Sequence, residues 1–183
     1  MSADRERTDA ELVQAVIAGD TFAYRELVER HGHRIFRFLA KHVTRLDDAE
    51  DLAQETFLQA YRSLAAYRGD AKFSTWLIGI ALNVARNHAN RTAPPVASLD
   101  DEVLDGLAGP ADPEEAAYCT AKLRAVQRAV GELPAEQREC VALVFFEGLS
   151  YEDAGRLLAL PTGTVKSRLF RARTKLAAAL KDY

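Results

Sequence analysis

The sequence SYEDAGRLLALPTGTVKSRLFRAR occupies residues 150–173 and decides the fold of the C-terminal part of the chain. Ser150 followed by Asp153 is typical of a helix start, in which a hydroxyl accepts a hydrogen bond from a backbone N–H of the first turn. Gly148 lies just before this start and ends the helix that we expect over Glu136–Glu147. Two helices therefore meet between Gly148 and Ser150.

The helix expected over Tyr151–Ala159 is short, because Pro161 cannot continue it. A second turn follows, and Thr162 or Thr164 opens a long final helix. A short helix, a tight turn and a long helix together predict a helix-turn-helix, in which the second helix enters the major groove of DNA.

The final helix has two faces of different chemistry. Its apolar stripe is expected to pack inward and comprises Val165, Leu169, Ala172, Leu176 and Ala179. The opposite face carries DNA-reading side chains, namely Lys166, Ser167, Phe170, Arg171 and Thr174, with Arg168, Arg173 and Lys175 on its shoulders. Arg and Lys can bond guanine edges, and Phe can contact a thymine methyl group. An outward Phe among arginines favours a DNA-reading helix over an ordinary solvated basic face.

Charge divides the chain into three blocks, although the net charge is only −3. Residues 96–118 contain seven Asp or Glu and no Lys or Arg, and Pro and Gly interrupt this stretch. Residues 156–183 are basic apart from Asp182. We expect a helical domain over 9–92, a flexible acidic linker over 93–117 and a second helical domain over 118–183.

Helical spacing continues through the N-terminal block, and no segment alternates with the period of a strand. The helices are expected over Asp9–Ala18, Thr21–Lys41, Asp47–Tyr67 and Ser74–Asn90. The predicted fold class is therefore all-α, with two small helical domains.

Several functional classes are disfavoured. No apolar run of membrane-spanning length and no signal-like N-terminus occur, so we expect a cytoplasmic protein without membrane insertion. Cys119 and Cys140 are too isolated for a disulfide framework or a zinc site. No catalytic constellation or phosphate loop stands out, so we expect neither an enzyme nor a cofactor.

Two helices of the N-terminal block have outward faces that could bind a partner. The helix over Asp47–Tyr67 turns Ala53, Phe57, Ala60 and Leu64 inward and leaves its carboxylates outward, as expected for docking on a basic partner or for a solvated face. In the next helix Phe73, Leu77, Ile80 and Val84 form the inward stripe, and Trp76, Asn83, Asn87 and Asn90 form a ridge beside it. Asn can bond exposed base edges, whereas Trp76 lies either in the core or against DNA.

Three motifs resemble a known family in its order along the chain. Residues 150–173 resemble region 4 of extracytoplasmic-function sigma factors, which binds the promoter minus 35 element. The sequence DAEDLAQETFLQAY at 48–61 resembles region 2.2, which docks on the polymerase clamp. The sequence YRGDAKFSTWLIGIALNVARN at 67–87 resembles regions 2.3 and 2.4, which recognise the minus 10 element and hold it open.

The resemblance implies a set of site residues. Those implied at the minus 35 element are Lys166, Ser167, Arg168, Phe170, Arg171 and Lys175. Those implied at the minus 10 element are Arg68, Lys72, Trp76, Asn83, Arg86 and Asn87, with the loop Arg68–Lys72 placed to wrap a flipped base. Those implied at the polymerase core are Asp48, Asp51, Gln54, Glu55 and Leu58.

The implied partners are the polymerase core, through its beta-prime clamp and beta flap, promoter DNA, and an anti-sigma factor. The acidic linker would thread through the polymerase. One departure from the family pattern is Ala154-Gly155, where a larger apolar residue and Ala are usual. Gly155 should weaken its helix by up to about 1 kcal/mol. The alternative reading is a stand-alone helix-turn-helix regulator that binds duplex DNA without polymerase.

Overall fold

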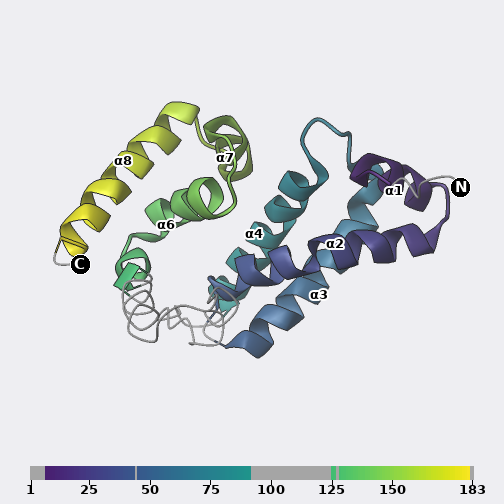
Figure 1. The fold of residues 1–183 in the computed structure, drawn as a ribbon, viewed down its shortest axis with the longest axis horizontal. Helices are drawn as coiled ribbons and strands as arrows, with labels where there is room; N and C mark the ends of the chain where they lie inside the picture. Colours follow the sequence, from purple (N-terminus) through teal and green to yellow (C-terminus); the bar gives the residue numbers. More distant parts are fainter. Residues whose placement is uncertain (1–6, 44, 92–124, 127, 182–183) are drawn as a thin grey trace, which may run out of the picture. The chain divides into compact units, whose positions relative to one another are not determined.

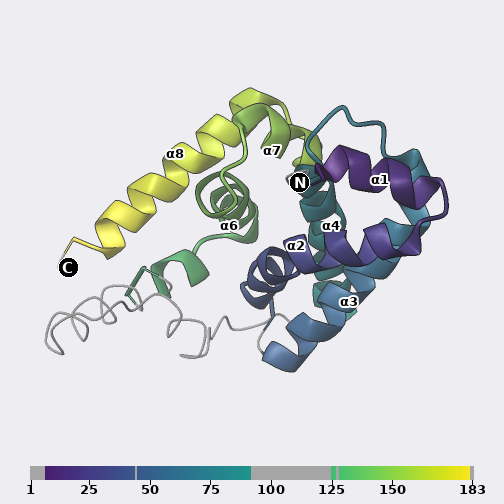
Figure 2. The ribbon, with the colours of Figure 1, turned by 45° about the vertical axis from the view of Figure 1, so that its right-hand side comes forward.

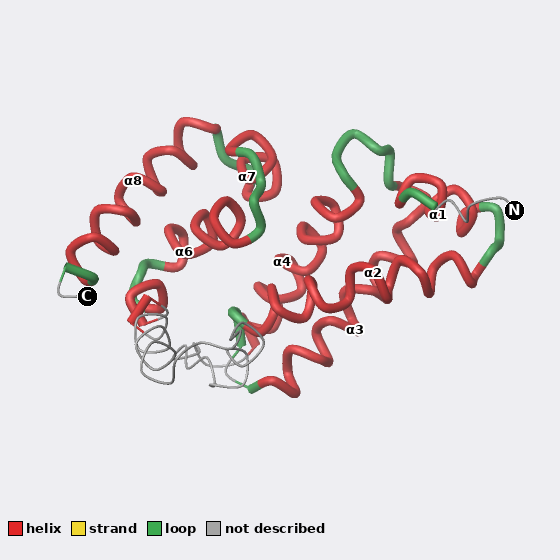
Figure 3. Tube along the Cα trace, in the orientation of Figure 1, coloured by secondary structure: helices red, strands yellow, loops and turns green. Residues whose placement is uncertain are grey.

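The computed structural model describes residues 7–43, 45–91, 125–126 and 128–181, and the predicted linker 93–117 and Cys119 lie outside these residues. The chain divides into two compact units, Met1–Pro95 and Val96–Tyr183, and each is described by itself. Every regular element in the described residues is helical (Figures 1 and 3), as the sequence predicted. None of their helices is long and apolar enough to cross a membrane.

The helices of the first unit are α1 (Asp9–Ile17), α2 (Thr21–Ala40), α3 (Leu46–Ser63), the 3₁₀ turn η1 (Leu64–Ala66) and α4 (Phe73–Arg91). α1, α3 and α4 all pack on α2, and α3 also packs on α4 (Figures 1 and 2). The centre of this unit is apolar, with the fully buried Leu12, Leu27, Phe38, Leu39 and Leu77. Burial of these side chains supplies the main stabilisation of the unit.

Local capping explains where the first two helices begin. The Thr8 hydroxyl accepts from the backbone N–H of Glu11, and the Glu11 carboxylate accepts from the N–H of Thr8, which completes a capping box. The Asp20 carboxylate likewise accepts from the N–H groups of Phe22 and Ala23 at the start of α2.

The structure corrects two expectations about the first unit. The helix expected to run to Tyr67 ends at Ser63, and the tighter η1 turn follows. The inward face of α4 is also broader than one stripe, because Ile78, Ala81, Leu82 and Ala85 are buried, whereas Ile80 is only half-buried. α4 packs on both α2 and α3, so more of its circumference is covered than a surface helix would show.

The second unit contains α6 (Ala135–Val141), the π-helical segment η4 (Ala142–Phe146), α7 (Tyr151–Leu158) and α8 (Thr162–Ala179). The expected helix over Glu136–Glu147 is therefore α-helical only in its first part. The Glu147 N–H donates to the Ala142 carbonyl, five residues earlier, and Gly148 then adopts a φ of +67°. Helices α6 and α7 both pack near α8, and Val165, Leu169 and Ala172 face inward.

The inward stripe of α8 is shorter than predicted. Leu176 is half-buried and Ala179 is exposed, so only the first half of the helix is anchored in the core. The start of α7 matches its prediction, because the Ser150 hydroxyl accepts from the N–H of Asp153 at 3.0 Å.

Gly155 has a structural reason that the sequence does not reveal. A Cβ atom at position 155 would lie 2.8 Å from the carbonyl oxygen of Leu160, and the Leu160 N–H donates to the Gly155 carbonyl at 2.8 Å. The turn between α7 and α8 thus folds directly over this glycine. It contains Ala159 in the left-handed region, with φ 55° and ψ 44°, which is unfavourable for a residue with a Cβ.

Gly155→Ala should therefore lower the stability of the helix-turn-helix by about 1–2 kcal/mol despite the better helix propensity of Ala. Ala159→Gly should raise it by about 0.5–1 kcal/mol, because it relieves the left-handed strain. Hydrogen exchange of the α7 and α8 amides measures both changes. A Gly155→Ala variant with greater protection of these amides would contradict the close-approach argument.

Candidate nucleic-acid and protein-binding surfaces

The helix-turn-helix presents a basic and aromatic face on α8. Lys166, Ser167, Phe170, Arg171 and Lys175 are all exposed, and the Phe170 side chain reaches 73% exposure. An apolar ring this exposed contributes little to the core of the unit, and here it lies among basic side chains. Basic groups around a ring are the chemistry that contacts phosphates and the thymine methyl group in a major groove.

Two hydroxyls on this face bond to their own helix. The Ser167 hydroxyl donates to the Thr164 carbonyl at 3.0 Å, and that of Thr174 donates to the Phe170 carbonyl at 3.1 Å. These local bonds hold the two side chains against the helix, so a DNA contact from either would require rotation about χ1. The Lys166 ammonium lies 5.8 Å from the centre of the Tyr151 ring, in a cation–π contact between α8 and α7.

Arg168 is turned away from the rest of the predicted reading face. Its guanidinium pairs with the Glu136 carboxylate at 2.8 Å, and its side chain is only 21% exposed. It also faces the thiol of Cys140, whose pKa burial raises while Arg168 opposes that rise. Arg168 therefore joins α8 to α6, and its guanidinium is engaged within the protein.

A mixed acidic and apolar surface lies on α3. Asp51 and Gln54 are exposed, Asp48 and Glu55 are half-buried, and Leu58 is 52% exposed. The Glu55 carboxylate accepts from the Gln59 amide at 2.8 Å, which fixes its orientation. The structure thus brings all five residues of the predicted core-binding set to the solvent side of one helix. An exposed leucine beside carboxylates suits a protein partner with a basic rim and an apolar centre.

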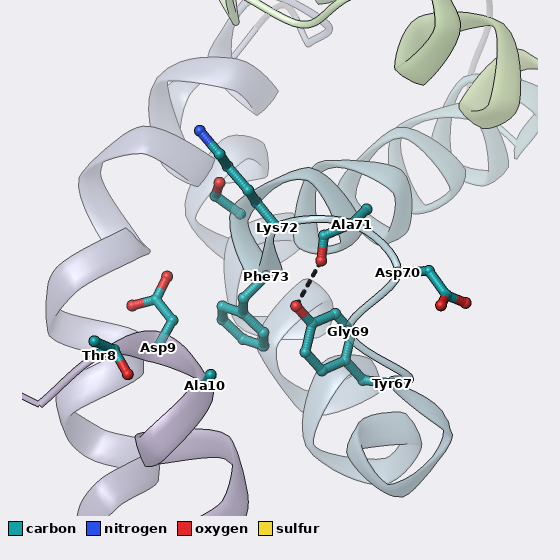
Figure 4. A pocket seen from close by; sticks show the side chains of 10 residues that line it. Thr8, Asp9, Ala10, Tyr67, Gly69, Asp70, Ala71, Lys72 and Phe73 are labelled. Carbon is teal, nitrogen blue, oxygen red and sulfur yellow. Dashed lines mark hydrogen bonds between the residues drawn. The ribbon is translucent and has the colours of Figure 1, made fainter.

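An open pocket of about 470 Å³ lies between the start of α1 and the loop that leads into α4 (Figure 4). Thr8–Ala10 line one side, and Tyr67 with Gly69–Ser74 line the other. The Tyr67 hydroxyl donates to the Ala71 carbonyl at 2.6 Å and so closes the loop on itself. Gly69 has a φ of +77°, which only glycine adopts readily.

Three aromatic rings form a cluster at this loop. Tyr67 lies 5.2 Å from Trp76 and 5.7 Å from Phe73, and Phe73 lies 5.6 Å from Trp76, measured between ring centres. Trp76 is half-buried, which is intermediate between the two alternatives that the sequence left open. Desolvation raises the pKa of Tyr67, with the nearby Asp9 and Asp70 charges adding to the rise, so its hydroxyl stays protonated near neutral pH.

The predicted minus 10 residues fall into two groups. Lys72 lines the pocket, whereas Arg68 is exposed but does not line it. Asn83 and Asn87 are exposed one turn apart on α4, and Arg86 is half-buried beside them. The amides are therefore available to a partner that passes along α4.

The sequence did not reveal that α1 forms a wall of the pocket. Asp9 holds α1 on α2, because its carboxylate pairs with the Arg30 guanidinium at 2.8 Å and with His31 Nε2 at 3.0 Å. His31 is buried, and its ring lies 5.4 Å from that of Phe73. Burial lowers the pKa of His31 from 6.5, although the Asp9 carboxylate opposes the shift. A lone Asp at a helix start gives no sequence signal for such a contact.

The lowered pKa predicts a pH-dependent stability of the first unit. The unfolded chain takes up a proton on His31 at higher pH than the folded chain does, so the free energy of unfolding falls as pH drops below 6.5 and is constant above it. The loss is at most about 1.4 kcal/mol per pH unit for one proton. Urea unfolding followed by Trp76 fluorescence measures it, since Trp76 is the single tryptophan. His31→Gln should flatten the dependence, and the exposed control His33→Gln should leave it unchanged.

No group of three or more His, Cys, Asp or Glu in the described part of the chain is arranged to hold a metal ion. Cys140 is a free thiol, fully buried beneath α8.

Comparison with known proteins finds similarity along almost the whole chain. The Sigma-70 region 2 family matches residues 27–93, and the Sigma-70, region 4 family matches residues 123–176. The RNA polymerase sigma-H factor of Pseudomonas aeruginosa is 39% identical over 181 residues, which cover 94% of each chain. The ECF RNA polymerase sigma factor SigM of Mycobacterium tuberculosis is 41% identical over 177 residues, which cover 96% of this chain and 86% of the relative.

Two solved structures are similar in fold. CnrH, solved in complex with the cytosolic domain of CnrY, has 26% identity and a TM-score of 0.70, with 95% of this chain and 97% of that chain covered. The sigma factor RpoE from Bartonella quintana, solved with the anti-sigma factor NepR, has 25% identity and a TM-score of 0.65, with 86% and 96% covered.

Proposed function

Because this chain belongs to the extracytoplasmic-function sigma factors of the sigma-70 family and acts as a non-catalytic transcription initiation factor, we propose a separate surface for each of three tasks. One surface docks on the polymerase core, a second recognises the minus 10 element and a third recognises the minus 35 element. The observation that carries the proposal is the separation of three chemistries. α3 presents carboxylates with an exposed leucine, and α8 presents cations with an exposed phenylalanine. The start of α4 lines an aromatic pocket, and exposed amides follow farther along the same helix.

The α3 surface, defined as Asp48, Asp51, Gln54, Glu55 and Leu58, docks on the clamp of the polymerase core. Its carboxylates orient the encounter with a basic partner, and the exposed Leu58 provides the apolar contact that excludes water. The second unit contributes a contact with the beta flap. The clamp assignment follows the family resemblance and the exposure of the α3 side chains, and the flap assignment follows the family resemblance alone.

The α8 face binds the minus 35 element in the major groove through Lys166, Ser167, Phe170, Arg171 and Lys175. Arg171 is suited to the edge of a guanine, and Phe170 to a thymine methyl group. Arg168 does not read bases in this arrangement; its ion pair with Glu136 holds α8 against α6.

The pocket and the exposed side of α4 hold the opened minus 10 element. Unstacking a base costs a few kcal/mol, which an aromatic-lined pocket offsets by stacking on the flipped base. The half-buried Tyr67 supplies the ring, with the buried Phe73 packed against it, and Lys72 supplies a cation. Asn83 and Asn87 supply edge bonds to bases farther along α4.

Asn87→Ala should slow promoter opening by about tenfold, corresponding to roughly 1.4 kcal/mol for one lost base contact, and leave core binding unchanged. Glu55→Ala should instead weaken core binding and leave the rate of promoter opening nearly unchanged. Permanganate reactivity of promoter thymines reports opening, and fluorescence anisotropy reports core affinity. An Asn87→Ala variant that opens promoters at the normal rate would exclude this residue from the minus 10 site.

An anti-sigma factor is a further proposed partner, because both similar solved structures are complexes and one partner is named an anti-sigma factor. Such a partner would cover the polymerase-binding and DNA-binding faces until a signal releases them.

The whole proposal is tested by mixing the purified chain with bacterial polymerase core, followed by gel filtration and run-off transcription on a genomic promoter library. Co-elution with promoter-selective transcripts is expected. Failure to bind core together with tight binding to duplex DNA would instead support a stand-alone regulator.

A further inference from the structure

A lysine and a tyrosine meet between the two helices of the helix-turn-helix. The Lys166 ammonium, on α8, lies 5.8 Å from the centre of the Tyr151 ring, on α7. This distance is within the range over which a cation is attracted to the face of an aromatic ring. Tyr151 therefore restricts the position of the Lys166 ammonium before any DNA is bound.

The backbone beneath both side chains is held in place. Tyr151 is the first residue of α7, and the Ser150 hydroxyl caps that helix. Val165, which directly precedes Lys166, is fully buried, and so is Ala154 on α7. The packing of α7 on α8 thus keeps the ring and the stem of the lysine at a constant separation.

This contact differs in kind from the ion pair of Arg168. The Glu136 carboxylate neutralises the Arg168 guanidinium, whose side chain is only 21% exposed. An aromatic ring attracts a cation without cancelling its charge, and residues 162–179 of α8 contain no Asp or Glu. Lys166 is also exposed, so its ammonium keeps its charge and its N–H donors for a partner.

The place of Lys166 on α8 gives this restriction a consequence for DNA binding. Lys166 is one turn before Phe170, which is exposed on the same face, and the first turns of a recognition helix are those that contact base edges. A lysine without such a contact is a flexible point charge that moves among neighbouring acceptors. A lysine held by a ring reaches fewer acceptors.

We propose that Tyr151 is a positioning residue for Lys166 and directs its ammonium to one base pair of the minus 35 element. Lys166 then contributes to base discrimination as well as to the attraction of phosphates, since guanine O6 and N7 accept hydrogen bonds from an ammonium. Tyr151 acts through the lysine and makes no base contact of its own. The proposal rests on the minus 35 function proposed above for the α8 face.

The expected effect follows from the strength of the contact. A cation–π contact at an exposed site corresponds to about a two- to fivefold change in an equilibrium constant. Tyr151→Leu should therefore reduce the base preference about two- to fivefold at the position that Lys166 contacts, and leave the other minus 35 positions unchanged. Tyr151→Phe keeps the ring and should retain the preference.

The test uses holoenzyme reconstituted from polymerase core and the full chain, with a promoter recovered from the genomic library and all its single substitutions in the minus 35 element. Competition binding measures the base preference at each position. Lys166→Met should flatten the preference at one position and so identify it. In the Lys166→Met background, Tyr151→Leu should have no further effect, because the ring then has no cation to hold. Glu152→Gln changes the exposed neighbour of Tyr151 and is the matched control, which should leave all preferences unchanged.

Nuclear magnetic resonance of the full chain gives a second measurement that is independent of DNA. The ε-methylene protons of Lys166 should resonate at higher field in the unchanged chain and in Tyr151→Phe than in Tyr151→Leu, because only the first two have a ring beside the ammonium. Equal shifts in all three chains would contradict the restriction of Lys166 by the ring.

An unchanged preference in Tyr151→Leu, at the position that Lys166→Met flattens, would overturn the proposal. Equal losses in Tyr151→Leu and Tyr151→Phe would also overturn it, because they would assign the effect to the Tyr151 hydroxyl. An even loss across all positions in Lys166→Met would make the lysine a phosphate contact and overturn the assignment to one base pair. Failure of the minus 35 function itself is distinguishable, since Arg171→Ala and Lys166→Met would then both leave every minus 35 preference unchanged. Hydrogen exchange of the α7 and α8 amides verifies that each variant is folded.

Discussion

Leu58→Asp is expected to lower the affinity for polymerase core by at least about 2 kcal/mol, or roughly 30-fold. Leu58 is 52% exposed on α3 and is surrounded by Asp51, Gln54 and Glu55, so it is the apolar centre of a polar surface. Replacement by Asp removes the apolar contact and places a charge where water is to be excluded. Folding should not change, because the side chain contributes little to the core.

Competition between labelled and unlabelled variants for polymerase core measures the effect of Leu58→Asp. Ile17→Asp is a suitable control, because Ile17 is similarly exposed, at 48%, but lies on α1. Equal losses for the two variants would show a general effect of surface charge, and no loss for Leu58→Asp would remove α3 from the docking surface.

Arg171→Ala is expected to cost about 1–3 kcal/mol on promoters with a guanine at the contacted minus 35 position and much less on promoters without one. The residue is exposed on the face of α8 that also carries Phe170. Transcription from promoter variants that differ only at single minus 35 positions measures the difference. Arg173→Ala, on the shoulder of the same helix, should weaken binding evenly across these promoters. An even loss for Arg171→Ala would identify that residue as a phosphate contact instead.

Sequence patterns predicted most of the fold because they depend on local rules. The starts of α1, α2 and α7 follow from side-chain caps at Thr8, Asp20 and Ser150, and the starts of the other long helices lie within one or two residues of their predictions. The all-helical character follows in the same way from the period of the apolar residues.

Features that depend on contacts between helices could not be predicted from the sequence. Arg168 lies within a basic motif, and only the approach of α6 shows that it pairs with Glu136. Asp9 forms a pocket wall through Arg30 and His31, which follow it by more than twenty residues. The π-helical turn at Ala142–Phe146 has no local signal either, yet it leaves Phe145 62% exposed.

The close approach of the Leu160 carbonyl to Gly155 also restricts how this segment can vary. An Ala at 155 would place its Cβ against the Leu160 carbonyl oxygen, whereas a Gly at 159 would relieve the left-handed strain of the turn. Because Ala at 155 costs about 1–2 kcal/mol against the turn in its present form, a chain that carries Ala at 155 should also carry a different turn at 159–161.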